Sequence, residues 1–340
     1  MTLDLRTGQD RPHRREDYNT KITAVAADER VPIPLWSQFL DRVTAQDKEL
    51  QAYLQRMAGY CMTGVTTEHV LFFLYGTGAN GKGVFLNTLH GIWGSYAAVA
   101  SMETFIETRY EQHSTDLAML DGARLVIAQE VEKGKAWSEA KINRLTGGDP
   151  ITARYMRQDF FTYKPKFKLI IAGNHKPSLR SVNEAVRRRF HLVPFTVTIP
   201  PAERDKGLFE KLKPEWPGIF NWALQGCLES QKIGLAPPKV VSEASEAYFA
   251  EEDLITTWIG ECCAVDEIYS ASSGELYQSW KKWAEDAGEH PGSNKAFSNS
   301  LEERGYKRKH TRDGSVFYGI ALTPPEMTEE EAAVRWWTGC

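Results

Sequence analysis

The sequence predicts an α/β fold: a parallel sheet core, a helical region before it and a small domain after it. Short, continuous apolar runs at residues 70–75, 124–128 and 168–172 are typical of buried parallel strands, and 192–195 is a fourth candidate. Helix-compatible stretches separate these runs, as the connections of a parallel sheet require. The first three runs are followed by glycine or polar residues. Because ligands bind at the carboxyl ends of such strands, candidate binding groups gather at one edge.

Sequence patterns divide the 340 residues into successive segments. Residues 1–66 form an N-terminal helical region, in which apolar residues recur at helical spacing over 35–43 and 50–60. The sheet core follows, and prolines then punctuate a helical lid and linker. Helical and hairpin patterns define a C-terminal domain before a loose tail. The predicted segments after the first are 67–200, 201–250, 251–323 and 324–340.

The most informative segment is the glycine-rich loop that follows the first predicted strand. Its glycines let several backbone N–H groups converge on one anion. A helix predicted over 84–93 starts at the loop and directs its positive end at the same anion. Lys82 can then reach the outer phosphates of a nucleoside triphosphate. The predicted nucleotide-binding residues are Gly76, Thr77, Gly78, Ala79, Asn80, Gly81, Lys82, Gly83 and Val84.

The loop departs from the usual pattern G-x-x-x-x-G-K-[ST] at its last position. Gly83 stands where a Ser or Thr hydroxyl normally binds Mg²⁺. Taken alone, the loop is also compatible with an ordinary turn between a strand and a helix. Glu130 and Asn174 follow two other predicted strands, so the three polar positions converge at one edge of the sheet. This convergence favours the nucleotide site over the turn.

A basic segment lies inside a chain whose net charge is −4. Residues 141–191 hold 12 Lys and Arg against three acids, with aromatic residues interleaved, which favours an anionic partner such as nucleic acid. Within this segment, 151–157 and 160–164 read as a β-hairpin with Arg157 near its tip. Arg157 and Lys164 are the predicted DNA-binding residues here. A solvated surface face is the alternative.

The C-terminal pattern predicts a winged-helix domain. Helices are expected over 255–262, 275–287 and 294–304, followed by strand-like runs on either side of Asp313-Gly314. Helices followed by a basic hairpin describe a winged helix, which is a relative of helix-turn-helix DNA-binding domains. A generic α+β end domain is the alternative. The predicted DNA-binding residues of this domain are Lys307, Arg308, Lys309 and Arg312.

Composition excludes several other classes of protein. No apolar run approaches the roughly 18–20 residues that a membrane span needs, and the N-terminus lacks an apolar signal core. The five cysteines show no C-x-x-C spacing, and the eight histidines form no H-E-x-x-H motif. We therefore expect an intracellular protein with reduced thiols and no membrane partner, located in the cytoplasm of a bacterial host.

The order and spacing of five stretches resemble the helicase half of phage and plasmid primase–helicases, within helicase superfamily three. The resemblance runs from about Leu3 to Leu322. It implies an AAA+-like ATPase core, a hexameric ring, and unwinding of forked DNA by translocation on a single strand. The matching stretches are 76–82, 124–130, 145–149, 168–177 and 187–195.

The resemblance implies a role for each polar residue at the sheet edge. Lys82 is similar to the phosphate-binding lysine, and ATP and Mg²⁺ are the implied cofactors. Glu130 is similar to the carboxylate that polarises the attacking water and supports the metal. Asn174 is similar to the polar residue that positions this water. Arg188 and Arg189 are candidates for an arginine that reaches into a neighbouring subunit's site, and phosphoryl transfer requires such positioning and charge neutralisation.

The chain also departs from this family. Gln129 stands where many P-loop enzymes carry an acid, so Glu130 is expected to hold the metal through water. Family members often carry a primase domain before the helicase, and this chain opens close to the helicase part. It is therefore expected to be a stand-alone helicase or a truncated reading frame, with a separate primase as a partner.

Other functions remain open on the sequence. One is a P-loop ATPase that loads on or binds origin DNA without unwinding it, or that packages DNA. A second is an origin-binding protein whose ATP site only binds, although such a protein needs neither Glu130 nor the arginines of 187–189. A small-molecule kinase is the weakest alternative, because the hairpin and the C-terminal domain have no role in it.

Overall fold

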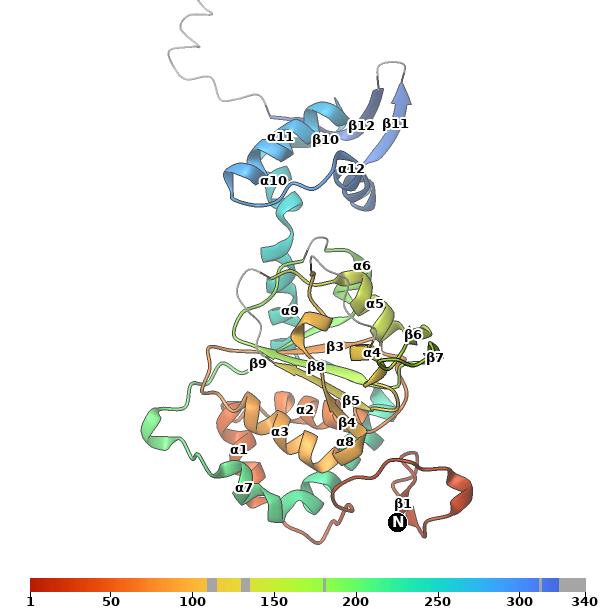
Figure 1. Cartoon of the computed structure of the whole chain (residues 1–340). Helices are drawn as coiled ribbons and strands as arrows, with labels where there is room; N and C mark the ends of the chain where they lie inside the picture. Colours follow the sequence, from red (N-terminus) through yellow and green to blue (C-terminus); the bar gives the residue numbers. More distant parts are fainter. Residues whose placement is uncertain (109–114, 130–134, 180–181, 312–313, 324–340) are drawn as a thin grey trace, which may run out of the picture. The chain divides into compact units, whose positions relative to one another are not determined.

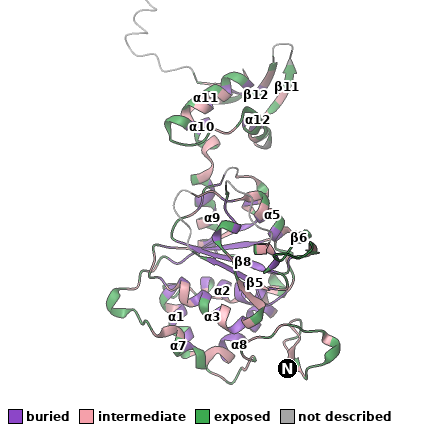
Figure 2. Ribbon diagram, viewed as in Figure 1, coloured by how far each residue is buried: buried purple, intermediate pink, exposed green. Residues whose placement is uncertain are grey.

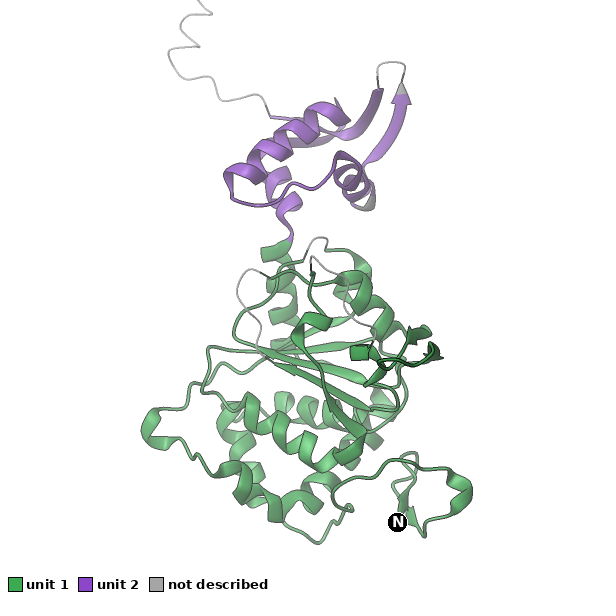
Figure 3. Cartoon of the chain, viewed as in Figure 1, with its two compact units in different colours: residues 1–252 green, residues 253–340 purple. Residues whose placement is uncertain are grey.

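The computed structural model describes residues 1–108, 115–129, 135–179, 182–311 and 314–323. Two compact units make up the chain, Met1–Glu252 and Asp253–Cys340 (Figure 3). The boundary lies two residues after the predicted start of the C-terminal domain. Each unit has a core of its own and is described by itself below.

The first unit is built on a parallel sheet with the strand order β4-β5-β8-β3-β9 (Figure 1). All four strands expected from the apolar runs are present, which confirms the α/β prediction. The edge strand β4 was not predicted, because it has only three residues and its side chains are half-buried or exposed. The strands are β3 (Leu71–Tyr75), β4 (Ala97–Val99), β5 (Leu125–Gln129), β8 (Lys168–Gly173) and β9 (Phe190–Pro194).

Helices cover both faces of this sheet, and its strands lie buried between them (Figure 2). In β3, Phe72 and Leu74 join one apolar cluster, whereas Leu71 and Phe73 join the other. This alternation explains why the strands read as continuous apolar runs. Over one face lie α1 (Pro34–Val43), α2 (Lys48–Tyr60), α3 (Lys82–Trp93) and α8 (Trp216–Ile233), and over the other lie α5 (Glu139–Gly147) and α9 (Lys239–Glu252).

The helical segments expected over 1–66 and 201–250 both belong to the first unit. Helices α2 and α8 cross with their backbones in contact. A Cβ added at Gly59 would lie 2.0 Å from the nitrogen of Cys227, and one at Gly226 would lie 2.0 Å from the oxygen of Gln55. Glycine is therefore required on both helices at the crossing. The remaining short elements of these segments are β1 (Thr2–Leu3), β2 (Asp10–Arg11), η1 (Arg15–Asp17), η4 (Pro201–Glu203), α7 (Leu208–Leu212) and η5 (Lys213–Glu215).

The predicted hairpin before β8 is present. It consists of β6 (Ile151–Ala153) and β7 (Phe161–Tyr163), which pair antiparallel with Ala153 opposite Phe161. The strands are shorter than expected, so residues 154–160 form the tip. The other short elements in the described part of the unit are η2 (Gly94–Tyr96), η3 (Met102–Thr104), α4 (Thr115–Ala118) and α6 (Glu184–Arg187).

The second unit packs three helices against a three-stranded antiparallel sheet with the order β10-β12-β11. The predicted helices and hairpin are present. Strand β10 was not predicted, because a register shift between Val265 and Ser270 interrupts it and most of its side chains are exposed. The elements are α10 (Leu254–Cys262), β10 (Cys263–Ser272), α11 (Ser273–Asp286), α12 (Asn294–Glu303), β11 (Lys307–Thr311) and β12 (Gly314–Leu322).

Candidate functional site

The glycine loop lies at the carboxyl end of β3, between this strand and α3. Tyr75 ends β3 and lies level with Gly173 of β8 and Pro194 of β9. The loop therefore emerges beside the segments that follow two neighbouring strands. Helix α3 begins at Lys82, so its N-terminus faces the loop. The sequence prediction placed the loop between a strand and a helix, and this arrangement is present.

Contacts from the segment after β9 hold the loop in place. The Nδ2 of buried Asn80 donates to the carbonyl of Phe195 at 2.7 Å, and the nitrogen of Ile199 donates to the carbonyl of Ala79 at 2.8 Å. A Cβ at Gly76 would lie 2.1 Å from the oxygen of Phe195. At Gly81, φ is +85° and a Cβ would lie 2.5 Å from Val43. The loop needs glycine at both positions.

Lys82 and Asn174 are in contact at this loop. The Lys82 Nζ donates to the carbonyl of Gly76 at 2.7 Å and to the Oδ1 of Asn174 at 3.2 Å. The lysine side chain is buried, and this burial lowers its pKa. An anion beside the ammonium would favour the charged form and offset the cost of burial. The predicted lysine and the predicted asparagine are thus adjacent.

The described residues at the loop offer little to a metal ion. Gly83 has no side-chain oxygen, and a Cβ placed there would have no atom within 4 Å. Gln129, the last residue of β5, is exposed and pairs with Ala172. Glu130, the predicted metal-binding and catalytic carboxylate, lies outside the described residues. Within the described ranges, no group of three or more His, Cys, Asp and Glu residues is arranged to hold a metal.

The arginines of 187–189 lie at the opposite end of the sheet from the loop. The carbonyl of Arg189 accepts from the nitrogen of Leu71, the first residue of β3, at 2.7 Å. A five-residue strand rises roughly 15 Å, so these arginines are distant from the loop of their own chain.

The three arginines have different surroundings. Arg189 is buried and donates to Thr146 Oγ1 at 3.2 Å and to the carbonyl of Ala185 at 2.7 Å. Its pKa is lowered by burial and then by the charge of Arg188. Arg187 pairs with Glu246 at 2.6 Å. Arg188 is exposed, and the described part of the chain gives it no ion-pair partner.

The predicted DNA-binding residues of the hairpin are both exposed. Arg157 lies in the tip with φ +62°, and Lys164 follows β7. In the second unit, the predicted cations divide between two faces of β11. Lys307 and Lys309 are exposed, whereas Arg308 lies over the ring of buried Phe317 at 5.9 Å. Arg312 lies outside the described residues.

A cluster around Lys176 joins the segment after Asn174 to the end of α9. The Lys176 Nζ pairs with Glu251 at 2.8 Å and lies 5.5 and 5.4 Å from the ring centroids of Tyr75 and Tyr248. The nitrogen of Leu179 donates to Glu252 at 2.8 Å. No sequence pattern reveals this cluster, because its members lie up to 177 positions apart.

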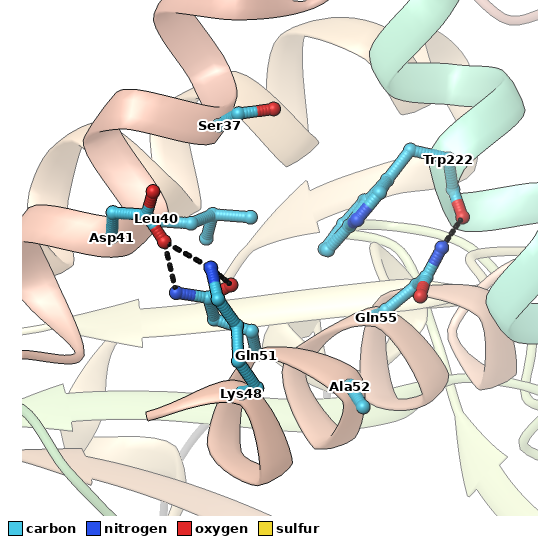
Figure 4. Close-up of a pocket in the computed structure, with 8 residues that line it drawn as sticks. All are labelled: Ser37, Leu40, Asp41, Lys48, Gln51, Ala52, Gln55 and Trp222. Carbon is cyan, nitrogen blue, oxygen red and sulfur yellow. Dashed lines mark hydrogen bonds and ion pairs between the residues drawn. The ribbon is translucent and has the colours of Figure 1, made fainter. Parts of the chain in front are cut away.

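A cavity of about 290 Å³ lies between α1, α2 and α8 (Figure 4). The carboxylate of Asp41 accepts from Lys48 and from Gln51, and Gln55 donates to the carbonyl of Trp222 at 2.8 Å. These polar groups form hydrogen bonds with one another, so they are not available to bind a ligand in the cavity. A second cavity of about 550 Å³ is lined by residues of α1, by Ala45 and Gln46 after this helix, and by Val197, which lies in the segment that holds the glycine loop. Among the described helices, none combines the length and apolarity needed to cross a membrane.

Two family models match parts of the chain. A family of unknown function (DUF5906) matches residues 74–189, which include the glycine loop, Asn174 and the arginines. A family described as D5 N terminal like matches residues 1–45. The first matched range therefore coincides with most of the candidate site.

Two curated viral proteins are similar to the chain. It is 27% identical over 259 residues to a protein of Acanthamoeba polyphaga mimivirus named "Putative helicase", with 70% of this chain and 27% of that protein covered. It is 25% identical over 260 residues to a protein of Frog virus 3 (isolate Goorha) with the same description, with 70% and 26% covered. The chain spans about a quarter of the length of each relative.

Among solved structures, the chain is similar to the C-terminal region of NrS-1. An apo form of that region aligns with a TM-score of 0.49 at 10% identity, covering 88% of this chain and 78% of that one. A second apo structure of the region aligns with the same score at 11% identity.

Proposed function

We propose that this chain is an ATP-dependent DNA helicase used in the replication of a phage or plasmid-like mobile element. In this proposal it assembles as a ring, with six subunits, and moves along single-stranded DNA. The contact between Lys82 and Asn174 at the glycine loop carries the proposal, because a cation and an amide then meet where outer phosphates would lie. The viral relatives and their names support a helicase over other ATPases.

In the proposed site, the chain's own groups bind and position the nucleotide. The loop N–H groups and the N-terminus of α3 hold the phosphates, and Lys82 neutralises their charge. Asn174 accepts a hydrogen bond from Lys82 through Oδ1, which leaves its Nδ2 donor to orient a water molecule. Glu130 is the proposed base that activates this water. ATP supplies the phosphoryl group when it is bound.

Mg²⁺ is part of the proposal through Glu130, which the sequence alone supports. The described residues around the loop do not fit a directly bound metal, because Gly83 lacks the usual hydroxyl. The ion therefore has no part in the roles assigned to Lys82 and Asn174.

A second subunit is proposed to complete the site. Arg188 is exposed, carries no described partner and lies about one strand length from its own loop, so its guanidinium is available to a neighbour. Arg189 is less suited to this role, because two donors of its guanidinium are already engaged within the chain. The observation favours Arg188 over Arg189 as the arginine that acts across the interface.

The proposed DNA contacts lie on two hairpins. Arg157 and Lys164 of the first hairpin grip the single strand, and Lys307, Lys309 and Arg312 of a winged helix hold duplex or forked DNA. Arg308 is a weaker candidate because its guanidinium lies against Phe317 on the other face of β11.

The test combines ATP turnover with strand separation on forked DNA. Lys82→Ala should abolish nucleotide binding, and Glu130→Gln should retain binding and stop turnover. Lys213→Ala, which removes a surface pair with Glu210, is a matched control. Normal turnover in Glu130→Gln would refute its assignment. Turnover without strand separation would favour the alternative, an ATPase that loads on or binds origin DNA without unwinding it.

A further inference from the structure

We propose that the tip of the β6–β7 hairpin stacks an unpaired nucleobase on Phe160. This inference rests on the proposed DNA function and adds a base contact to the proposed phosphate contacts. Apolar side chains are prominent at the tip: Met156 is 76% exposed and Phe160 is 60% exposed. Large apolar side chains held in water at a projecting tip indicate a binding role, because burying them on a partner is favourable.

An aromatic row supports the tip from below. The Tyr155 and Phe161 rings stack at 5.6 Å, and the Phe161 and Tyr163 rings stack at 6.0 Å. The hydroxyl of Tyr155 donates to the carbonyl of Ala118 at 3.1 Å, and that of Tyr163 donates to the carbonyl of Leu117 at 2.6 Å. The row therefore anchors the hairpin to the end of α4. Because this row fixes the position of the hairpin, binding at the tip loses less conformational entropy than binding by a loose loop would.

The tip itself has a defined backbone. The nitrogen of Gln158 donates to the carbonyl of Tyr155 at 3.1 Å, which closes a turn. Arg157 adopts φ +62° in this turn, although it is not glycine. Such a conformation is unfavourable for a residue with a side chain and persists where the surrounding structure maintains it.

Charge around Phe160 selects nucleic acid as the partner. The Arg154 guanidinium lies 4.7 Å from the ring centroid of Phe160, so a cation and an aromatic ring form one unit. Residues 151–166 contain four cations and one acid, Asp159. Rings that accept bases, combined with cations that accept phosphates, are the parts of a single-strand binding site. The ring gives affinity without sequence preference, because every base has a π-face.

The experiment compares two oligonucleotides of equal length, one of thymidines and one with abasic positions, by fluorescence anisotropy across a salt series. The full chain should bind the thymidine strand more tightly. Phe160→Ala should remove this preference and weaken binding to thymidines by roughly 5- to 100-fold, with an unchanged salt slope. Arg157→Ala should instead retain the preference and lower the slope by about one unit.

Two further variants separate stacking from general apolar contact. Phe160→Trp should retain the preference for bases, whereas Phe160→Leu, which keeps apolar area without a π-face, should lose most of it. Because Phe160 is exposed, each variant should unfold at the wild-type temperature, which thermal melting checks.

The outcomes also separate this inference from the proposed function. If the full chain binds both oligonucleotides equally and Phe160→Ala leaves the affinity unchanged, the stacking proposal is wrong and the proposed DNA binding stands. A full chain that binds neither strand overturns both proposals. Phe160-dependent binding to phospholipid vesicles, without a preference among oligonucleotides, overturns the inference in favour of a membrane contact.

Discussion

At the scale of single residues, the glycine loop combines positions that demand glycine with one that does not. Gly76 and Gly81 have backbone or side-chain atoms where a Cβ would lie, whereas the space around Gly83 is open. The absence of a hydroxyl at Gly83 is therefore not a steric requirement of the fold. A side chain with a hydroxyl can therefore be introduced at Gly83, where the usual motif binds Mg²⁺.

Gly83→Ser should fold at least as stably as wild type, because serine has better helix propensity than glycine and its side chain meets no atom. In the proposed site, the new hydroxyl adds the oxygen that Mg²⁺ usually binds. We expect Mg²⁺ to increase the affinity for ATP by a larger factor in Gly83→Ser than in wild type. Titration of a fluorescent nucleotide measures this factor. Gly83→Ala is the control with a Cβ and no oxygen, and equal behaviour of both variants would contradict the prediction.

A half-buried histidine makes stability dependent on pH. His191 lies on β9 with its Nδ1 2.6 Å from the hydroxyl of Tyr53, and burial lowers its pKa to about 4. As pH falls from 6.5, the unfolded chain takes up this proton before the folded chain does. The contribution of neutral His191 to the free energy of unfolding is therefore complete above pH 6.5. It is lost as the pH falls from 6.5 to 4, which lowers the free energy of unfolding by about 3 kcal/mol.

His191→Gln should reduce the fall in the free energy of unfolding between pH 6.5 and 4. Urea unfolding at pH 7 and at pH 4.5 gives the change in free energy of unfolding for each protein. His290→Gln, at an exposed position, is the control that should keep the wild-type profile. A fall in stability as large in His191→Gln as in wild type would show that other groups cause it.

At the scale of elements, α9 is fastened to the segment that follows β8. Lys176 and Leu179 of this segment contact Glu251 and Glu252 at the end of the helix. Asn174, which touches Lys82, lies two residues before Lys176. A change at the loop therefore has a short covalent and hydrogen-bonded route to the last turn of α9.

Lys176→Met should loosen this attachment while keeping much of the side-chain volume. The lost ion pair and two ring contacts are worth about 1–2 kcal/mol together. We expect faster hydrogen exchange at residues 174–179 and in the last turn of α9, measured by mass spectrometry. Lys239→Met is the control, since its pair with Glu243 is exposed on the same helix. Equal exchange in both variants would show that Lys176 does not fasten the two elements.

At the scale of the whole molecule, the proposed active site extends over two subunits, and the proposed DNA contacts lie on both units of one chain. Arg188 lies at the end of the sheet opposite the glycine loop. With the glycine loop at one end of the sheet and Arg188 at the other, the arginine of one subunit can meet the loop of the next in a head-to-tail assembly. Such an assembly closes into a ring when the rotation between subunits permits.

Arg188→Ala should be inactive alone and should recover some ATP turnover when mixed with the inactive Lys82→Ala protein. Mixed rings then contain sites in which the lysine and the arginine are both intact. Arginines acting in this way contribute roughly 10³–10⁵ in rate in well-studied cases. Arg189→Ala, in contrast, should lower the thermal midpoint, because it leaves the Thr146 hydroxyl without its buried donor. Assembly of both proteins without recovery at any mixing ratio would rule out the shared site.

Removing residues 253–340 should leave ATP turnover and assembly largely intact and weaken binding to forked DNA. The cut falls between the two compact units, so the core of the first unit stays complete. Anisotropy at matched salt measures the loss. Undiminished binding by the shortened chain would identify the second unit as a structural cap.

The sequence by itself determined the parallel strands other than β4, the glycine loop, helices α1, α2 and α3, the helices of the second unit and both hairpins, because local periodicity and turn residues encode them. Asn174 could also be predicted, since the carboxyl ends of parallel strands share an edge. Glu130 and Arg312 stay predictions, because they lie outside the described residues. Only the tertiary structure decided which arginine of 187–189 is buried, which face of β11 carries Arg308, and how Lys176 meets α9. These features depend on contacts between residues far apart in the chain, and on burial, which the type of a residue alone does not fix.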